Sequence, residues 1–157
     1  PFNPFKSCVV PRPIGWVSTV SHDGIVNLAP FSMFNQLNYD PPFVCFSGSN
    51  RPNTGQRKDS VTNAEETGEF VVNMATYELR EKVCMTSQFV GPEVDEFELA
   101  GLTKLSSNLV RPPRVAALRR SSREIVEGSR PSRRAISRTP APWALRMAIS
   151  SRSENDR

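Results

Sequence analysis

The stretch that decides the fold is Ile14-Gly15-Trp16-Val17-Ser18-Thr19-Val20, followed by Ser21-His22-Asp23-Gly24 and then Ile25-Val26-Asn27-Leu28. The first and third segments are rich in β-branched and other apolar residues, which favour extended backbone. The middle segment ends in Asp-Gly, a pair that supplies the positive φ angles of a tight turn. This part of the chain therefore predicts a β-hairpin.

Strand patterns continue downstream of the hairpin. Asp40-Pro41-Pro42 interrupts pairing, and Phe43-Val44-Cys45-Phe46 then predicts a buried strand. Residues 58–67 predict a short helix, and Glu69-Phe70-Val71-Val72-Asn73-Met74 predicts a core strand. Strands, hairpins and two short helices predict a mainly β fold, a small β-barrel with short helices rather than a βαβ sheet.

The two predicted helices carry end signals of their own. Asp59 or Ser60 can cap the first helix, and Gly68 follows its last residue. Thr76 can cap a second helix, which places Leu79 on its apolar face. We expect both helices to decorate the barrel.

The end of the chain differs in composition from the rest. Residues 116–157 hold ten arginines and eight serines against four acidic residues, and they lack any sustained hydrophobic period. Residues 1–115 hold ten basic and twelve acidic residues, so the net charge of +4 comes from the end of the chain alone. We therefore divide the chain into a folded domain, residues 1–115, and an Arg/Ser-rich tail, residues 116–157, with too little apolar surface to fold.

Two origins of this tail stay open. A frameshift near Ala116 explains its composition, because out-of-frame reading of GC-rich coding sequence yields mainly Arg, Ser, Ala and Pro. The alternative is a natural, disordered basic tail. Sequencing the gene distinguishes the two, because a frameshift requires another reading frame that encodes strand-like sequence.

The cysteines and the hydropathy limit the class of protein. Cys8, Cys45 and Cys84 have neither CxxC nor metal-ligand spacing, so we expect buried free thiols in a reducing cytoplasm. No apolar stretch approaches the roughly 20 residues that span a bilayer, and no signal peptide precedes Pro1. We expect a cytoplasmic protein with no membrane partner, and we interpret a start at Pro1 as that of a fragment or trimmed chain.

Three segments occur in an order that resembles one known family. Pro11–Val20, Asn27–Phe34 and Pro41–Ser49 are similar to the flavin reductase-like proteins, which bind FMN in a split β-barrel and include flavoredoxins and the reductase components of two-component monooxygenases. The resemblance covers about residues 1–115. It implies an FMN-binding split barrel that is incomplete at its C-terminus, because Val110–Val115 leads in the family to further strands.

The resemblance also implies where FMN binds. In the family, one strand edge lies against the flavin, the neighbouring segment offers backbone and hydroxyl contacts, and a turn and the start of the next helix approach the phosphate. The cofactor-binding residues implied in this way are Ser18, Thr19, Val20, Asn27, Ala29, Pro30, Ser32, Ser47, Gly48, Ser49, Arg51, Lys58, Asp59 and Thr62.

The residue types fit this assignment but do not require it. FMN presents a dianionic phosphate, a polar ribityl chain and a flat, partly apolar ring. By charge, Arg51 and Lys58 are the best phosphate counter-ions in residues 1–115, and a helix start adds backbone N–H donors. Ser18 and Thr19 could equally be ordinary strand residues, the serines and glycine of residues 47–49 a plain turn, and the cations solvated charges.

No catalytic acid or base is predicted. His22, the only histidine, lies in the predicted turn, and Glu65 and Glu66 are adjacent on a helix and point apart. The four acidic residues within 93–98 predict a solvated surface rather than a cation site. No GxGxxG pattern occurs, so we expect NADH or NADPH to dock transiently over the flavin.

The resemblance implies an NAD(P)H-dependent flavin reductase that passes electrons to a partner monooxygenase, to free flavin or to another acceptor. It also implies a homodimer, because FMN lies at a dimer interface in the family. The alternatives are an FMN-binding electron carrier without efficient NAD(P)H turnover, an inactive truncated barrel, and a nucleic-acid-binding protein. The last is disfavoured, because the basic tail lacks interleaved aromatic residues for base stacking.

Overall fold

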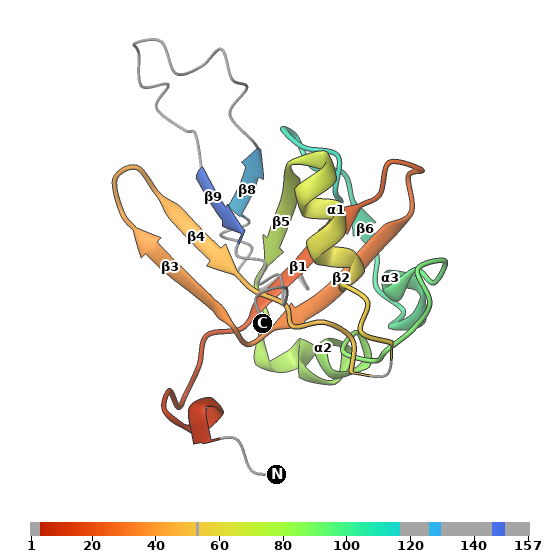
Figure 1. Ribbon diagram of the computed structural model, residues 1–157. Helices are drawn as coiled ribbons and strands as arrows, with labels where there is room; N and C mark the ends of the chain where they lie inside the picture. The colour runs from red at the N-terminus through yellow and green to blue at the C-terminus, as the bar shows by residue number, and fades with distance from the viewer. Residues whose placement is uncertain (1–3, 53, 117–125, 130–145, 150–157) are drawn as a thin grey trace.

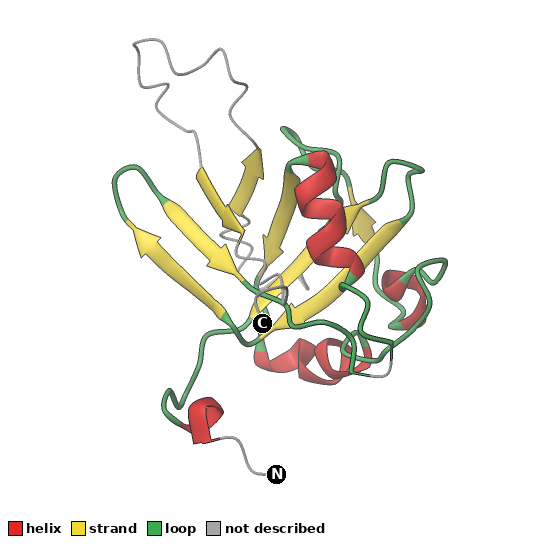
Figure 2. Ribbon diagram, viewed as in Figure 1, coloured by secondary structure: helices red, strands yellow, loops and turns green. Residues whose placement is uncertain are grey.

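The structure is a computed structural model that describes residues 4–52, 54–116, 126–129 and 146–149. The fold is mainly β with short helices, which confirms the predicted fold class (Figures 1 and 2). The strands are β1 (Gly15–Val20), β2 (Val26–Phe31), β3 (Phe34–Asn38), β4 (Phe43–Phe46), β5 (Glu69–Asn73), β6 (Lys104–Leu105), β7 (Arg114–Val115), β8 (Val126–Ser129) and β9 (Arg146–Ile149). The helices are α1 (Asp59–Thr67), α2 (Arg80–Met85) and α3 (Glu96–Leu99), with single 3₁₀ turns at Pro4–Ser7 and Tyr77–Leu79.

The predicted hairpin lies at the centre of the molecule. β1 and β2 pair antiparallel, with Gly15 opposite Phe31, and the turn between them uses Gly24 at a φ of 85°. β5 pairs with the other side of β1, which gives a four-stranded sheet in the order β2-β1-β5-β8. Because β1 has neighbours on both sides and covered faces, all six of its residues are buried.

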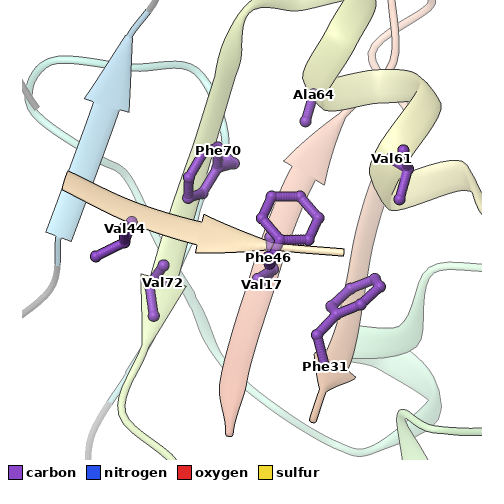
Figure 3. Packing of buried hydrophobic residues seen from close by; sticks show 8 residues of the cluster. All are labelled: Val17, Phe31, Val44, Phe46, Val61, Ala64, Phe70 and Val72. Atoms are coloured by element: carbon purple, nitrogen blue, oxygen red, sulfur yellow. The ribbon is translucent and has the colours of Figure 1, made fainter. Parts of the chain in front are cut away.

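One face of this sheet carries the larger apolar core, beneath α1 (Figure 3). Its buried members are Val17, Phe31, Val44, Phe46, Val61, Ala64, Phe70 and Val72. The ring centroid of Phe46 lies 5.0 Å from that of Phe31 and 5.0 Å from that of Phe70. Aromatic pairs at such distances stabilise a fold by about 0.5–1.5 kcal/mol each beyond their burial. Phe46 thus joins the three-stranded sheet β3-β4-β9 to the four-stranded sheet.

The opposite face of the four-stranded sheet carries a second core. Successive side chains of a strand point to opposite faces, so Trp16 lies on this face while Val17 lies under α1. The buried members of the second core are Trp16, Leu28, Leu79, Phe97 and Val115. Leu79 precedes α2 and Phe97 belongs to α3, so this core holds both short helices against the sheet.

The ends of α1 agree only partly with the prediction. Gly68 ends the helix as predicted, at a φ of 74°, and its N–H donates to the Ala64 carbonyl. The predicted caps Asp59 and Ser60 are wrong, because the N-cap position is Lys58 and no side chain caps the helix. Both side chains bond to residues outside the helix instead: Asp59 pairs with Arg51, and the Ser60 hydroxyl donates to Asn27 Oδ1.

The proline-rich stretch before residue 116 is joined to the sheet by polar groups. The Asn73 side chain accepts from the Val115 N–H at 2.8 Å and donates to the Ser18 hydroxyl at 3.2 Å. The Ser18 hydroxyl in turn donates to the Pro113 carbonyl at 2.6 Å. These bonds, with the β6–β7 pairing, place residues 113–115 against the centre of the sheet.

Two short strands lie within the predicted tail, where no strand was expected. β8 pairs antiparallel with β5, and β9 pairs parallel with β4. A strand edge offers unpaired N–H and C=O groups, which another segment can pair with through its backbone alone. The spacing of apolar residues along the sequence therefore predicts such strands poorly. Residues 117–125, 130–145 and 150–157 lie outside the described part, and the division at residue 116 stays a prediction.

Two further expectations concern the cysteines and the membrane. The prediction of buried thiols is wrong for Cys8 and Cys84, which are exposed, while Cys45 is partly buried. Both exposed cysteines lie outside the two cores, one just after the first 3₁₀ turn and the other on α2. In the part of the chain that the structure describes, no helix has the length and apolar character needed to cross a bilayer.

Candidate functional site

A pocket is lined by residues of β2, of the start of α1 and of the segment after α2. Figure 1 shows these elements close to one another. Its cavity volume is about 50 Å³, and it is open to solvent. The lining residues are Asn27, Ala29, Pro30, Arg51, Lys58, Asp59, Ser60, Thr86, Ser87, Gln88, Phe89, Val90 and Glu96. They come from parts of the chain far apart in sequence, so the pocket is a product of tertiary packing.

The pocket brings together six of the predicted site residues: Asn27, Ala29, Pro30, Arg51, Lys58 and Asp59. The other eight do not line it: Ser18, Thr19, Val20, Ser32, Ser47, Gly48, Ser49 and Thr62. The six that converge lie on β2, in the loop after β4 and at the start of α1. The eight remaining assignments stay predictions.

The residues of β1 are held inside the sheet. Ser18 and Thr19 are fully buried, and Val20 is nearly so. Ser18 bonds within the sheet as described above, while the Thr19 hydroxyl accepts from Asn63 Nδ2 at 3.2 Å. Thr19 also donates to Asn27 Oδ1, and Asn27 lines the pocket.

Gly48 lies in the loop after β4 and packs against α1. A Cβ atom at this position would lie 2.9 Å from Val61 Cγ2 and 3.1 Å from Phe31 Cε1, closer than side chains normally approach. The same atom would lie 3.4 Å from Cδ of Lys58. The lack of a side chain at Gly48 therefore allows the start of α1 to sit close to the loop after β4.

We call Arg51, Lys58 and Asp59 the rim of the pocket. The Arg51 guanidinium pairs with the Asp59 carboxylate and donates to the Val90 carbonyl at 2.9 Å. The Lys58 ammonium lies 5.3 Å from the ring centroid of Phe31 and 5.9 Å from that of Phe89. Both predicted cations thus reach the pocket, but the charge of Arg51 is shared with a carboxylate.

We call Asn27, Ser60 and Glu96 the floor of the pocket. Asn27 Nδ2 donates to Glu96 Oε1 at 2.7 Å, and the Leu28 N–H donates to Glu96 Oε2 at 3.0 Å. On its other side, Asn27 Oδ1 accepts from the Ser60 hydroxyl and from the Thr19 hydroxyl. The floor is therefore a continuous chain of hydrogen bonds that joins α3, β2, α1 and β1.

Glu96 corrects the expectation of a solvated acidic surface at residues 93–98. Only 4% of Glu96 is exposed, although its neighbour Glu98 remains exposed. β2 is an edge strand of the described sheet, so its outward N–H at Leu28 needs an acceptor, and Glu96 supplies one. Burial raises the pKa of the Glu96 carboxyl, and the nearby charges of Asp59 and Asp95 add to the rise, while the Leu28 N–H opposes it.

The wall formed by residues 86–90 was not predicted from the sequence. Trp16 Nε1 donates to Thr86 Oγ1 at 2.9 Å, and Thr86 Oγ1 donates to the Val83 carbonyl at 3.0 Å. This segment follows α2, and the sequence at the end of a helix does not indicate which surface the next residues face. Among the described residues, no group of three His, Cys, Asp or Glu side chains is arranged to hold a metal ion.

Comparisons with known proteins agree with the resemblance. The family model of the flavin reductase like domain matches residues 7–121. An uncharacterized protein of Aquifex aeolicus is 54% identical over 107 residues, which are 68% of this chain and 54% of that protein.

Solved structures extend the comparison to the fold. Nitrilotriacetate monooxygenase component B from Bacillus cereus is 35% identical with a TM-score of 0.64, and the match covers 69% of this chain and 52% of that one. A split barrel domain protein from Shewanella frigidimarina is 23% identical with a TM-score of 0.59, over 74% of this chain and 55% of that one.

The chain spans about half the length of the relatives it matches. The described sheets share the split-barrel fold of these neighbours, although they do not close into a barrel. The family match extends over well over half of the chain and contains the whole pocket. The chain therefore belongs to the flavin reductase-like family.

Proposed function

We propose that this chain forms the FMN-binding part of an NAD(P)H-dependent flavin reductase, which passes electrons to a partner oxygenase, free flavin or another acceptor. Membership of the flavin reductase-like family supports flavin oxidoreductase chemistry. The likeness to a monooxygenase component B supports an oxygenase as the partner. The observation that carries the proposal is the pocket, which combines cations, hydroxyl groups and a helix start in one depression.

The donor set at the rim fits a phosphate. Lys58 occupies the N-cap position of α1, and no side chain caps the first turn of that helix. The first N–H groups of a helix lack backbone partners within the helix and favour anions. Lys58 and these N–H groups would hold the phosphate of FMN. Arg51 would contribute if its guanidinium bonded to the phosphate as well as to Asp59, or in place of it.

The rest of the pocket fits the neutral parts of FMN. Ser60 and Ser87 offer hydroxyl groups to a ribityl chain, and Asp59 can accept from its hydroxyls. Ala29, Pro30 and Phe89 provide apolar surface for a flat ring. The residues present therefore match the group that the family implies, from its charged end to its apolar end.

When bound, FMN accepts a hydride and releases electrons one or two at a time, so the protein needs no nucleophile of its own. The residues of the chain bind and orient. The rim neutralises the charged end, while the floor fixes the position of β2 relative to α1. NADH or NADPH would dock over the open side of the pocket, since the sequence has no GxGxxG fingerprint.

A homodimer is part of the proposal. The β3–β4 hairpin, which projects from the four-stranded sheet in Figure 1, leaves Leu37 55% exposed and Tyr39 87% exposed. Apolar side chains that stay this accessible are favourable contacts for another protein surface. A second copy of the chain would also enclose a pocket that is open to solvent in one copy.

Flavin titration tests the binding step. We expect the purified chain to quench the fluorescence of FMN on binding and to bind riboflavin more weakly, because riboflavin lacks the phosphate. Lys58→Ala should reduce FMN affinity roughly tenfold and riboflavin affinity little, given the strength of charge-assisted bonds to phosphate. The matched control is Arg57→Ala, which removes an exposed neighbouring cation paired with Glu65 outside the pocket.

Two outcomes separate the proposal from its alternatives. A wild-type chain that binds neither flavin contradicts it. A chain that binds FMN but consumes neither NADH nor NADPH in the steady state, with FMN in excess, supports the electron-carrier alternative.

A further inference from the structure

The carboxylate of Glu96 is placed where it can control the shape of the pocket. It is buried at the edge of β2, and each of its oxygens accepts one hydrogen bond from that strand. One donor is the backbone N–H of Leu28, and the other is the side-chain amide of Asn27. Glu96 itself belongs to α3, which contacts β2 but contributes no other lining residue.

The bond to Glu96 determines how the Asn27 amide is turned. An amide side chain donates at its nitrogen and accepts at its oxygen, and a carboxylate only accepts. With its nitrogen directed to Glu96, Asn27 presents its oxygen to the hydroxyls of Ser60 and Thr19. Ser60 lies in the first turn of α1, next to the rim.

We propose that Glu96 is a positioning residue for flavin binding: its carboxylate orients the Asn27 amide and, through Ser60, holds the first turn of α1 beside β2. This inference rests on the proposed function, because it concerns the pocket in which FMN would bind. Glu96 acts through Asn27 and Ser60, and it need not touch the flavin. The effect passes from Glu96 on α3 through Asn27 on β2 to Ser60 in the first turn of α1, beside which the phosphate of FMN would bind.

The substitution Glu96→Gln tests the polarity of this network with almost no change in size. Glutamine offers one acceptor and one donor, while both partners of Glu96 are donors. One N–H must lose its acceptor, or the Asn27 amide must turn over and present its nitrogen to Ser60. Leaving a buried donor unsatisfied is costly, so we expect the FMN affinity to fall roughly tenfold.

A double substitution, Asn27→Asp with Glu96→Gln, provides the rescue. The carboxylate introduced at position 27 accepts from Ser60, from Thr19 and from the amide nitrogen introduced at position 96. The amide oxygen at position 96 accepts from the Leu28 N–H. Charge, size and every hydrogen bond are then retained, with the charge moved across one 2.7 Å bond. We expect the double variant to recover most of the FMN affinity, and Asn27→Asp alone to bind weakly because two carboxylates would face each other.

The experiment is a fluorescence titration of FMN with the full chain and these three variants, together with thermal unfolding of each without FMN. Glu98→Gln, an exposed position on the same helix, is the control and should bind like the wild type. The inference is overturned if Glu96→Gln binds FMN as the wild type does. It is also overturned if the folded double variant regains thermal stability but not affinity. A wild-type chain that does not bind FMN contradicts the proposed function itself, and the two failures are thus distinguished.

Discussion

The rim and the floor of the pocket each contain a carboxylate, and the two are held in opposite ways. At the rim, Asp59 is partly exposed and is paired with the guanidinium of Arg51. At the floor, Glu96 is buried and accepts from two neutral donors of β2, the Asn27 amide and the Leu28 N–H. A partly exposed ion pair contributes little to stability, whereas a buried carboxylate depends on each of its donors. The rim is therefore adaptable to a ligand, and the floor is a fixed support.

The largest expected effect comes from removing the carboxylate of the floor. Glu96→Ala leaves the Asn27 amide and the Leu28 N–H without their acceptor in a buried site. We expect the free energy of unfolding to fall by about 2–4 kcal/mol, measured by urea denaturation. Glu98→Ala on the same helix should change it by no more than about 0.5 kcal/mol. Equal losses for the two variants would mean that Glu96 stabilises the fold no more than an exposed carboxylate does.

The rim can be displaced without altering any of its charges. Gly48→Ala places a methyl group 2.9 Å from Val61 Cγ2, so the start of α1 must move away from the loop after β4. We expect a loss of about 1–2 kcal/mol in the free energy of unfolding, because overpacking forces backbone shifts. Weaker FMN binding should accompany it, since Lys58 moves with the helix. An unchanged free energy of unfolding in a urea titration would show that the structure accommodates the added methyl group without moving α1.

The pH dependence of stability distinguishes the floor from the rim. Burial raises the pKa of Glu96 in the folded state above its ordinary value of 4.5, so the folded chain binds this proton more tightly than the unfolded chain. Stability contributed by this group therefore falls as the pH rises from about 4.5 through the raised pKa, and the loss is complete above it.

The measurement compares the wild type with Glu96→Gln by urea denaturation across this pH range. The stability difference between the two should change with pH in the stated direction, because only the wild type titrates at this position. A difference that does not vary with pH, or that varies with the opposite sign, contradicts the prediction.

The smallest expected effect concerns the ion pair of the rim. Asp59→Asn should lower the free energy of unfolding by no more than about 1 kcal/mol, since the pair is partly exposed. The same change releases Arg51 toward the pocket, so FMN should bind roughly threefold more tightly, as expected for a removed nearby charge in a solvent-exposed site. A weaker affinity for FMN in the titration would mean that the bonds from the ribityl hydroxyls to Asp59 outweigh the release of Arg51.

Sequence patterns predicted the parts of the molecule that depend on neighbours in the chain. The hairpin at residues 14–28, the strand at 43–46 and the end of α1 at Gly68 all follow from local alternation and turn chemistry, and the structure confirms them. The caps of α1 were predicted wrongly. Asp59 and Ser60 are good capping residues, but each has a tertiary partner that competes with the helix end.

The sequence also predicted only part of the site, because local patterns do not show which distant residues come together. Lys58 and Arg51 were identified by charge, and both reach the pocket. Glu96 was missed because an acidic residue in a run of acidic residues is usually exposed, and only the edge of β2 requires it to be buried. The wall at residues 86–90 was missed because a helix end carries no information about the surface it faces.

By itself, the amino-acid sequence determined the local helices, strands and turns and the cations that could bind a phosphate. It also fixed the order of the three segments that resemble the flavin reductase-like family. The tertiary structure alone decided that the Glu96 carboxylate is buried, how the Asn27 amide is turned and that Arg51 pairs with Asp59. The physical reason is distance along the chain. Hydrophobic period and turn chemistry act over a few residues, whereas the bond from Asn27 to Glu96 joins positions 69 residues apart and exists only once β2 and α3 have packed together.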